Sequence, residues 1–524
     1  MTKITLKSAL LATTFVVSSS LALAQNVFNV GNGGEPGSLD PHAISGTWES
    51  SIARDQFVGL YTEAADGSLL PGAATGHTVS DDGLVYTFNI RNHSWSDGTP
   101  VTAHDFEFAF KRILDPATAA SYAYLMHIID GAEAFNGGDG SADDVGVRAV
   151  DDNTLEVTLA NPAPYFIAQT THNTAYPVPK HAVEQYGADW ARPENIVVNG
   201  AFKVSEWNIG DRLTVLKNDS FYDAANVSLD QVNFYPIDDV NTELNLYREG
   251  ELDVTSTVPA DDIAAMRDEF GNEVMITPYG GTYYYAFNTT IEPFNDPAIR
   301  SALSMTIDRD FITENVNTSG VDAAYSFVPT SIPGGYSPQQ PSWAFMSYGV
   351  RVAKAKSIME DAGYSADNPL SVVLSYNTSE GHKNVALAVS DMWAEIGVEV
   401  ELYNSDVSSH YDALQAQDFQ VGRAGWIWDY ADAENLLALM TEGVPYNYGK
   451  YMNPEFEALM DASYLQSGAE RIATLEAAEA IAMEEAALAP IYYYNSLHLV
   501  ADYVEGYVAN GDDRHPSRWI TLSD

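Results

Sequence analysis

Residues 370–376 (LSVVLSY) form a short apolar run that predicts a buried strand. Helical patterns flank this run at 350–362 and 383–396, each followed by a glycine, and another strand is predicted at 398–403. Strand, helix and strand in this order predict a right-handed β-α-β unit, and therefore an α/β fold. Ligands of such folds bind beyond the carboxyl ends of the strands, which makes the loop 377–382 a candidate wall of a binding crevice.

A second segment is expected at the same edge of the sheet. Residues 419–424 predict another buried strand, which places the sequence that follows, up to Tyr430, at its carboxyl end. Within residues 422–430 (GRAGWIWDY), Asp429 lies among three aromatic residues, six positions after Arg423. A carboxylate shielded by rings favours a cationic partner, through a charge-assisted hydrogen bond of about 1.5–3 kcal/mol and through cation-π attraction. This segment therefore suits an ammonium group.

The same nine residues also allow a purely structural interpretation. Trp426 and Trp428 would then be core aromatic residues, and Asp429 would cap a helix predicted at 433–440.

Upstream, the sequence predicts a smaller lobe. An alternating strand at 84–90 leads to a turn at 97–100, and Thr102 with Asp105 predicts the N-terminal cap of a helix. A further strand is expected at 154–159. Two tyrosine triplets, 283–285 and 492–494, have strand-like settings. Alternate rings should face opposite sides of a sheet, so that one face can pack in a core while the other lines a cleft. Core packing alone is the alternative, and it should hold for at least one ring in each triplet.

Composition excludes several classes of function. The chain has 524 residues, with 25 Lys and Arg against 73 Asp and Glu, for a formal net charge of −48. A nucleic-acid binder needs clustered basic residues, so nucleic acid is excluded as a partner. The sequence contains no cysteine, so disulfides and thiolate metal sites are excluded as well. The length predicts two or three domains.

The N-terminus has the pattern of a secretory leader. Lys3 and Lys7 precede an apolar run, and residues 22–24 (ALA) match a signal-peptidase site after Ala24. The mature protein is therefore expected to be exported and soluble.

Motifs of catalysis are missing from the sequence. It has no G-x-S-x-G, H-E-x-x-H or phosphate-loop motif, and none of the eleven histidines lies three or four residues from another. The acidic loop 137–144 does not match a calcium-loop spacing. We predict no enzyme activity, no catalytic residue, no cofactor and no metal site. An exported hydrolase with paired carboxylates remains a remote alternative.

Several short motifs, in the same order, resemble the periplasmic oligopeptide-binding proteins, the solute receptors of bacterial peptide ABC importers. They are 38–42 (SLDPH), 95–103 (WSDGTPVTA), 105–106 (DF), 178–180 (VPK), 199–202 (NGAF), 293–296 (PFND), 308–309 (DR) and 423–426 (RAGW). The resemblance implies a type II periplasmic-binding-protein fold, with two lobes, an extra inserted domain, and mixed sheets flanked by helices. It also implies domain I at 25–65, 191–276 and 489–524, domain II at 66–190, and domain III at 277–488.

The resemblance also implies a binding site. Asp429 would pair with the α-ammonium group of a peptide, and Arg423 and His382 would meet a ligand carboxylate. The remaining implied ligand-binding residues are Trp426, Gly425, Trp428, Tyr122, Tyr279, Tyr284, Tyr494 and Glu35. The chain departs from the family pattern at Ala286, Val407, Gln415, Asn315 and Asn317, which leaves open how the far end of the ligand is held.

Taken together, these features predict a monomeric periplasmic receptor that encloses short oligopeptides between two lobes and delivers them to the membrane permease of an ABC importer. A receptor of the same fold for another amine-bearing solute, such as a dipeptide, a murein peptide or an opine, is the alternative.

Overall fold

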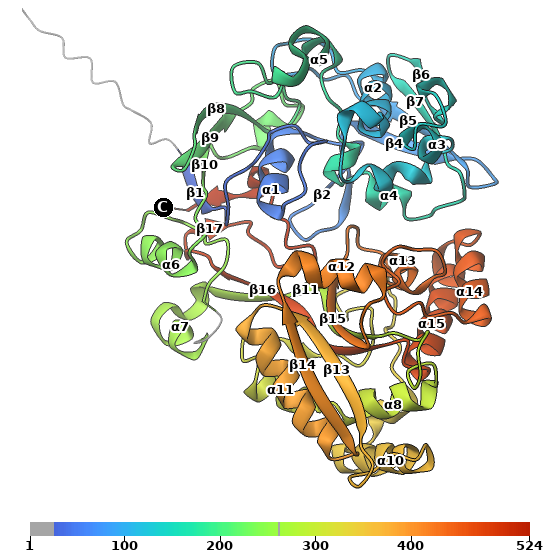
Figure 1. Cartoon of the computed structure of the whole chain (residues 1–524). Coiled ribbons are helices and arrows are strands. Elements are labelled where there is room, and N and C mark those ends of the chain that lie inside the picture. The colour runs from blue at the N-terminus through green and yellow to red at the C-terminus, as the bar shows by residue number, and fades with distance from the viewer. Residues whose placement is uncertain (1–25, 260–262, 524) are drawn as a thin grey trace, which may run out of the picture.

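The structure is a computed structural model that describes residues 26–259 and 263–523. The expected leader, with its cleavage after Ala24, lies outside these residues. The described chain forms two lobes that contain separate mixed sheets, seen one above the other in Figure 1. No helix among the described residues has the length and apolar character needed to cross a membrane.

The first sheet of the upper lobe joins segments that are distant in the sequence. Its strand order is β1-β10-β9-β8, in which β1 is parallel to β10 and the other pairs are antiparallel. The strands and the helices near this sheet are β1 (Val27–Gly31), β8 (Phe202–Asn208), β9 (Arg212–Lys217), β10 (Gln231–Tyr235), α1 (Thr47–Gln56), α6 (Val240–Arg248) and α7 (Ile263–Phe270).

The second sheet of the upper lobe is fully antiparallel, in the order β4-β5-β7-β6. The predicted strands at 84–90 and 154–159 are β5 and β7, and the predicted cap of α2 is present, since Thr102 N donates to Asp105 Oδ2 at 2.8 Å. The elements of this region are β2 (Tyr61–Glu63), β3 (Leu69–Pro71), β4 (Ala74–Val79), β5 (Val85–Ile90), α2 (Ala103–Leu114), α3 (Ala132–Asn136), β6 (Val147–Asp151), β7 (Thr154–Thr158), α4 (Phe166–Gln169) and α5 (Lys180–Tyr186).

The lower lobe contains the predicted β-α-β unit. Strand β13 is parallel to β14, with α11 between them in the chain, and β15 is also parallel to β13. The full strand order is β12-β16-β11-β15-β13-β14. The elements are β11 (Val274–Phe287), α8 (Pro297–Thr306), α9 (Arg309–Asn315), β12 (Asp322–Ala323), α10 (Tyr348–Asp361), β13 (Leu370–Asn377), α11 (Glu380–Ala394), β14 (Val398–Ser405), α12 (Val407–Ala416), β15 (Val421–Ile427), α13 (Ala433–Leu437), α14 (Pro454–Tyr464), α15 (Gly468–Glu484) and β16 (Leu488–Leu499).

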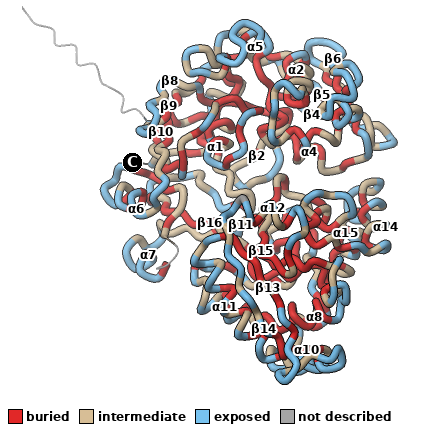
Figure 2. The backbone as a smooth tube through the Cα atoms, in the orientation of Figure 1, coloured by how far each residue is buried: buried red, intermediate tan, exposed pale blue. Residues whose placement is uncertain are grey.

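Both faces of the central strands in the lower lobe are buried, as the red strands β11, β13 and β15 in Figure 2 show. Alternate rings of the triplet 283–285 do face opposite sides, but each side has its own apolar core. Tyr283 and Tyr285 pack in one cluster and Tyr284 in the other, each at most 2% exposed. Of the two interpretations of this triplet, the structure shows core packing on both faces.

Two long strands connect the lobes. The N-terminal part of β11 pairs with the C-terminal part of β16, and β16 continues into the upper lobe, where Thr255 N donates to Leu499 O at 3.0 Å. The chain then ends in the upper lobe with β17 (Val504–Glu505) paired to β18 (Thr521–Leu522). The two-lobed α/β fold with mixed sheets is confirmed, whereas the three domain boundaries stay a prediction.

The motif at 38–42 has a structural role. Asp40 lies buried and accepts hydrogen bonds from Arg112 Nη2 at 2.5 Å and Trp190 Nε1 at 3.1 Å. This carboxylate therefore fastens the first loop of the chain to helix α2.

Candidate functional site

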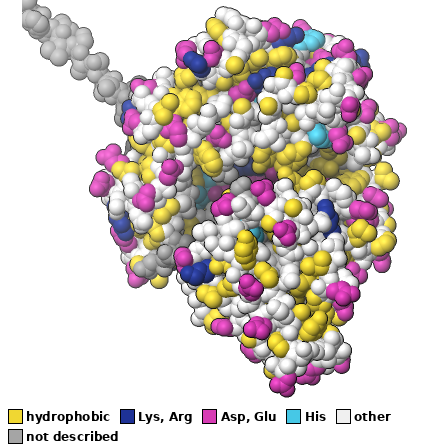
Figure 3. All heavy atoms as spheres, viewed as in Figure 1, with side chains coloured by type: hydrophobic (Ala, Val, Ile, Leu, Met, Phe, Trp, Pro, Cys, Tyr) yellow, Lys and Arg dark blue, Asp and Glu magenta, His cyan; other side chains and the backbone are white. Residues whose placement is uncertain are grey.

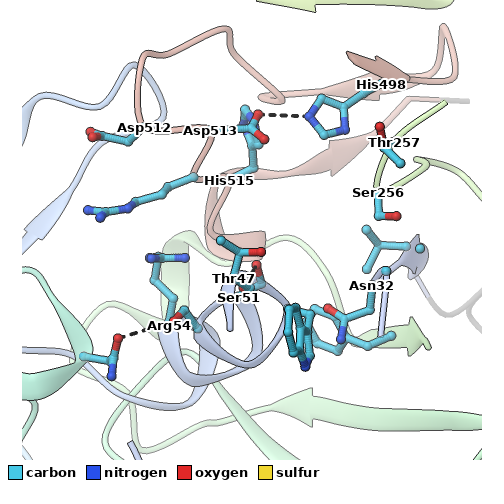
Figure 4. Close-up of a pocket in the computed structure, with 18 of the residues that line it drawn as sticks. Asn32, Thr47, Ser51, Arg54, Ser256, Thr257, His498, Asp512, Asp513 and His515 are labelled. Carbon is cyan, nitrogen blue, oxygen red and sulfur yellow. Dashed lines mark hydrogen bonds and ion pairs between the residues drawn. The ribbon is translucent and has the colours of Figure 1, made fainter. Parts of the chain in front are cut away.

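A cavity of about 500 Å³ lies where the upper lobe, the C-terminal segment and the end of β15 meet. Its lining is drawn from residues that lie hundreds of positions apart, as the close-up in Figure 4 illustrates. The segments that contribute to the lining are 28–33, 44–54, 255–257, 427–429 and 512–517, together with single residues that include Tyr122, His172, Tyr279 and His498.

Asp429 lines this cavity directly after strand β15. Its carboxylate accepts one long hydrogen bond, from Asn435 Nδ2 at 3.5 Å, and forms no ion pair within the described chain. Burial raises the pKa of this carboxyl to about 6, against smaller opposing effects of Asn435 and Arg514. The group is thus ionised at neutral pH but poorly compensated, which suits a cationic ligand.

The backbone around Asp429 is fixed from several sides. Arg514 Nη2 donates to the carbonyl oxygen of Asp429 at 3.0 Å, and Trp428 N donates to Gly280 O at 2.9 Å. The Trp428 indole is buried and donates through Nε1 to Asp512 Oδ1 at 2.5 Å. A Cβ at position 280 would overlap this indole, so glycine is required there.

Two predicted tyrosines share the cavity with Asp429. Tyr122 stacks on His172 with a centroid distance of 5.7 Å, and Tyr279 lies beside the C-terminal segment. Burial raises the pKa of Tyr122, and the nearby charge of Asp429 raises it further. Burial also raises the pKa of Tyr279, to about 12. Both phenols therefore stay protonated and can donate hydrogen bonds.

A second group of predicted residues surrounds Arg423 on the lower sheet. The guanidinium donates from Nη1 to Tyr411 OH at 3.0 Å and to Asn377 Oδ1 at 3.2 Å, and from Nη2 to Tyr494 OH at 2.9 Å. It also lies 4.8 Å from the ring centroid of Tyr283. All of these partners are neutral, and Arg423 forms no ion pair with any carboxylate in the part of the chain that the structure describes.

His382 and Gly425 belong to the same group. The ring of His382 lies 5.5 Å from that of Tyr283, and burial, followed by the charge of Arg423, lowers the pKa of His382 to about 3. This imidazole is therefore neutral. A Cβ at Gly425 would overlap the Tyr494 hydroxyl, so this glycine leaves room for the bond between Tyr494 and Arg423.

Three predicted residues belong to neither group. Trp426 is half-buried and donates through Nε1 to Asn435 Oδ1 at 3.2 Å, so it shares that asparagine with Asp429. Tyr284 is buried in the core against Phe327. Glu35 accepts from Trp207 Nε1 at 2.6 Å on the upper lobe. A contact of these three with ligand stays a prediction.

The structural alternative for Asp429 is wrong in one respect. The N-cap of α13 is Asp432, which accepts from Glu434 N at 2.9 Å, and Asp429 does not cap this helix. Trp428 is indeed a core aromatic residue.

Sequence reasoning missed most of the lining from the C-terminal segment. Arg514 Nη1 donates to Glu63 Oε1 at 2.5 Å, and Arg54 lies 3.6 Å from the other oxygen of the same carboxylate. Asp513 lies within hydrogen-bonding distance of His498 and His515. The dense charges of residues 512–515 (DDRH) were the only local signal, because the partners of these residues are distant in sequence.

Residues 68–448 match the family described as bacterial extracellular solute-binding proteins, family 5. The periplasmic oligopeptide-binding protein OppA of Escherichia coli is 39% identical over 482 residues, which cover 91% of this chain and 88% of that protein. This chain belongs to family 5 of the bacterial extracellular solute-binding proteins. The family resemblance of its motifs is thereby confirmed.

Solved structures of family members match over nearly the whole chain. The murein tripeptide-binding protein MppA in its unliganded open form has a TM-score of 0.86 at 35% identity, covering 95% of this chain and 98% of that one. OppA of Haemophilus influenzae in complex with the peptide RPPGFSPFR has a TM-score of 0.78, also at 35% identity, covering 96% and 99%.

Proposed function

We propose that this protein is a periplasmic receptor that binds short oligopeptides between its lobes and delivers them to the permease of an ABC importer. The observation that carries the proposal is Asp429, an ionised cavity carboxylate that lacks a cationic partner among the described residues. An α-ammonium group would supply that partner, and the phenols of Tyr122 and Tyr279 line the same cavity.

Arg423 supports the opposite end of the same ligand. Its guanidinium is held by three neutral groups and has one face against the Tyr283 ring. The positive charge of Arg423 is therefore uncompensated. The guanidinium and the neutral imidazole of His382 would together bind a peptide carboxylate. Arg423 lies on β15, whereas Asp429 follows the end of that strand. A ligand with an amine at one end and a carboxylate at the other fits this polarity.

The remaining parts of the proposal follow from the family. Cleavage after Ala24 would release the protein into the periplasm, and the three domains would have the boundaries given above. Strands β11 and β16 would serve as the hinge, because they carry the chain from one lobe to the other. Closure around a peptide would then present a distinct surface to a permease.

The test is direct identification of the ligand. The mature protein is purified without denaturation, then unfolded, and the released molecules are identified by mass spectrometry. A heterogeneous set of short peptides with free N-termini supports the proposal. A single murein-type peptide, dipeptide or opine would support the alternative receptor, and no released amine-bearing solute would contradict both.

A second measurement separates binding from catalysis. Purified protein is incubated with a synthetic tetrapeptide, and the peptide is examined for cleavage while thermal denaturation reports binding as a raised Tm. Intact peptide with a raised Tm is expected. Progressive cleavage that Asp429→Asn abolishes would instead support the carboxylate-dependent hydrolase.

A further inference from the structure

Three side chains of metal-ligating type converge on one wall of the cavity. His498 Nε2 lies 2.9 Å from Asp513 Oδ1, and His515 Nε2 lies 3.2 Å from the same oxygen. The three ligand atoms all lie within 4.8 Å of one another. His498 comes from β16, whereas the other two come from the C-terminal segment, and Figure 4 shows the side chains turned toward one another.

The hydrogen bonds of His498 leave a place for a positive charge. Its Nδ1 lies 2.9 Å from the backbone oxygen of Thr255, and a carbonyl oxygen can only accept, so Nδ1 carries a proton. In the neutral ring, Nε2 would then present a lone pair to the Asp513 carboxylate, which is repulsive. Either a second proton or a cation must therefore lie between them. A histidine that donates to a backbone carbonyl and presents its other nitrogen inward is the usual arrangement for a metal ligand.

His515 is held in a comparable way. Its ring stacks on Tyr507 with a centroid distance of 3.7 Å, and its side chain is only 8% exposed. Its Nδ1 is buried without a hydrogen-bond partner in the described structure, so no second bond fixes the tautomer of this ring. Nε2 can thus be either a donor to Asp513 or a lone-pair ligand.

We propose that His498, Asp513 and His515 form a binding site for a divalent first-row transition cation such as Zn²⁺. Two imidazoles with one carboxylate suit zinc, cobalt or nickel, whereas calcium and magnesium prefer ligand sets made of oxygen atoms. Neighbouring ligand atoms around a tetrahedral zinc lie roughly 3.3 Å apart, given bond lengths of about 2.0–2.1 Å. The two observed separations are close to this value.

The site would be open on one side. Asp513 is 21% exposed and lines the cavity together with both histidines, so water or a ligand atom can complete the coordination. Three protein ligands and a free position are the pattern of an accessible zinc site rather than a closed structural one. The inference depends on these three residues alone and does not rest on the proposed peptide receptor.

The experiment uses untagged mature protein freed of metal with a chelator. Zn²⁺ is titrated by calorimetry, and Co²⁺ serves as a second probe, because its visible absorption reports nitrogen and oxygen ligands directly. One equivalent of each ion should bind. Asp513→Asn and His515→Gln should each weaken Zn²⁺ binding at least tenfold, whereas excess Ca²⁺ or Mg²⁺ should not compete.

The matched control is His181→Gln. His181 Nε2 lies 2.8 Å from Asp97 Oδ2 in a surface pair that has no third metal-ligating side chain among the described residues, so this variant should bind Zn²⁺ as the parent does. Thermal denaturation checks the folding of each variant, and His515→Gln decides the matter if Asp513→Asn does not fold. Absence of stoichiometric binding would overturn the proposal. The proposal would also be overturned if Asp513→Asn and His515→Gln fold and bind Zn²⁺ with the affinity of the parent. In that case the three side chains form only a hydrogen-bond network, which requires no metal.

Discussion

Peptide affinity should have a bell-shaped pH dependence, because the two partners of the amine contact titrate on either side of neutrality. Burial raises the pKa of Asp429 to about 6, and a peptide α-amine has a pKa of about 7.7–8.0. The contact requires ionised Asp429 and protonated amine. Binding therefore lowers the pKa of the carboxyl and raises that of the amine, so that affinity is lost as pH falls through 6 and as it rises through about 8.

The size of the effect follows from the two pKa values. At pH 7 about nine-tenths of Asp429 is ionised in the free protein, whereas at pH 5 about one-tenth is. The Kd should thus rise roughly tenfold between these pH values, and by a similar factor between pH 7 and pH 9 as the amine loses its proton. Asp429→Asn should weaken binding at pH 7 by about 3–5 kcal/mol, a hundredfold or more in Kd, because the amine would remain buried without its counter-charge.

Calorimetric titration of a tripeptide between pH 4.5 and 9.5 measures this curve in the parent and in two variants. Asp429→Asn should lose both limbs, because without the carboxylate the complex no longer favours the protonated amine. Glu434→Gln is the matched control, because burial also raises the pKa of Glu434, to about 7, but Tyr430 and Tyr464 satisfy its carboxylate outside the cavity. The assignment of Asp429 is refuted if the parent has a constant Kd between pH 7 and 5, or if Asp429→Asn keeps the same acidic limb.

Three further predictions test the surroundings of the site. Gly280→Ala should destabilise the protein by about 1–3 kcal/mol in urea unfolding because a Cβ overlaps Trp428, whereas Gly76→Ala, which meets open space, should be near neutral. Glu63→Gln should cost about 3–5 kcal/mol at pH 7 because it removes the ion-pair partner that the buried guanidiniums of Arg54 and Arg514 share. Burial raises the pKa of Glu63, but the charges of Arg514 and Arg54 outweigh burial and hold this pKa below 4.5. The ionised carboxylate therefore contributes its full stabilisation above pH 4.5 and loses it as the pH falls through the pKa of the folded state. If Glu63→Gln destabilised the protein equally at a pH below that pKa, the ion pairs would be contradicted. Amidation of a tripeptide should weaken calorimetric binding by about 1.5–3 kcal/mol in the parent but little in Arg423→Met, and an equal loss in both would exclude Arg423 as the carboxylate partner.

The fold was predictable where its causes are local. The β-α-β unit is encoded by apolar periodicity and by Gly363 and Gly397, both of which adopt positive φ in the structure. Thr102 and Asp105 likewise cap α2 through bonds between near neighbours. The sequence left two interpretations of the tyrosine triplet 283–285 open, because alternation along a strand does not reveal how many layers cover the sheet. Here apolar cores cover both faces.

The residues of the site also differ in whether local sequence could predict them. Asp429 and Trp428 could be proposed from nine consecutive residues, because a carboxylate and its ring neighbours lie together in the chain. The cluster of His498, Asp513 and His515 could not, since a strand and a loop supply its members and Thr255 orients one of them from far upstream. Pairing of this kind depends on tertiary contacts, which no local pattern in one sequence reports.

The charge that selects a ligand is local, although the whole chain is strongly acidic. Acidic side chains are scattered over the surface in Figure 3, and exposed charges more than about 8–10 Å away are largely screened at physiological salt. Around the cavity, Glu63 compensates Arg514 and Arg54, and Asp513 raises the pKa of His498 against the opposing effect of burial. Asp429 has no such partner among the described residues. Its single uncompensated charge, held in place by the Arg514 bond to its own carbonyl, therefore gives the cavity its preference for a cation, and the scattered surface acids do not.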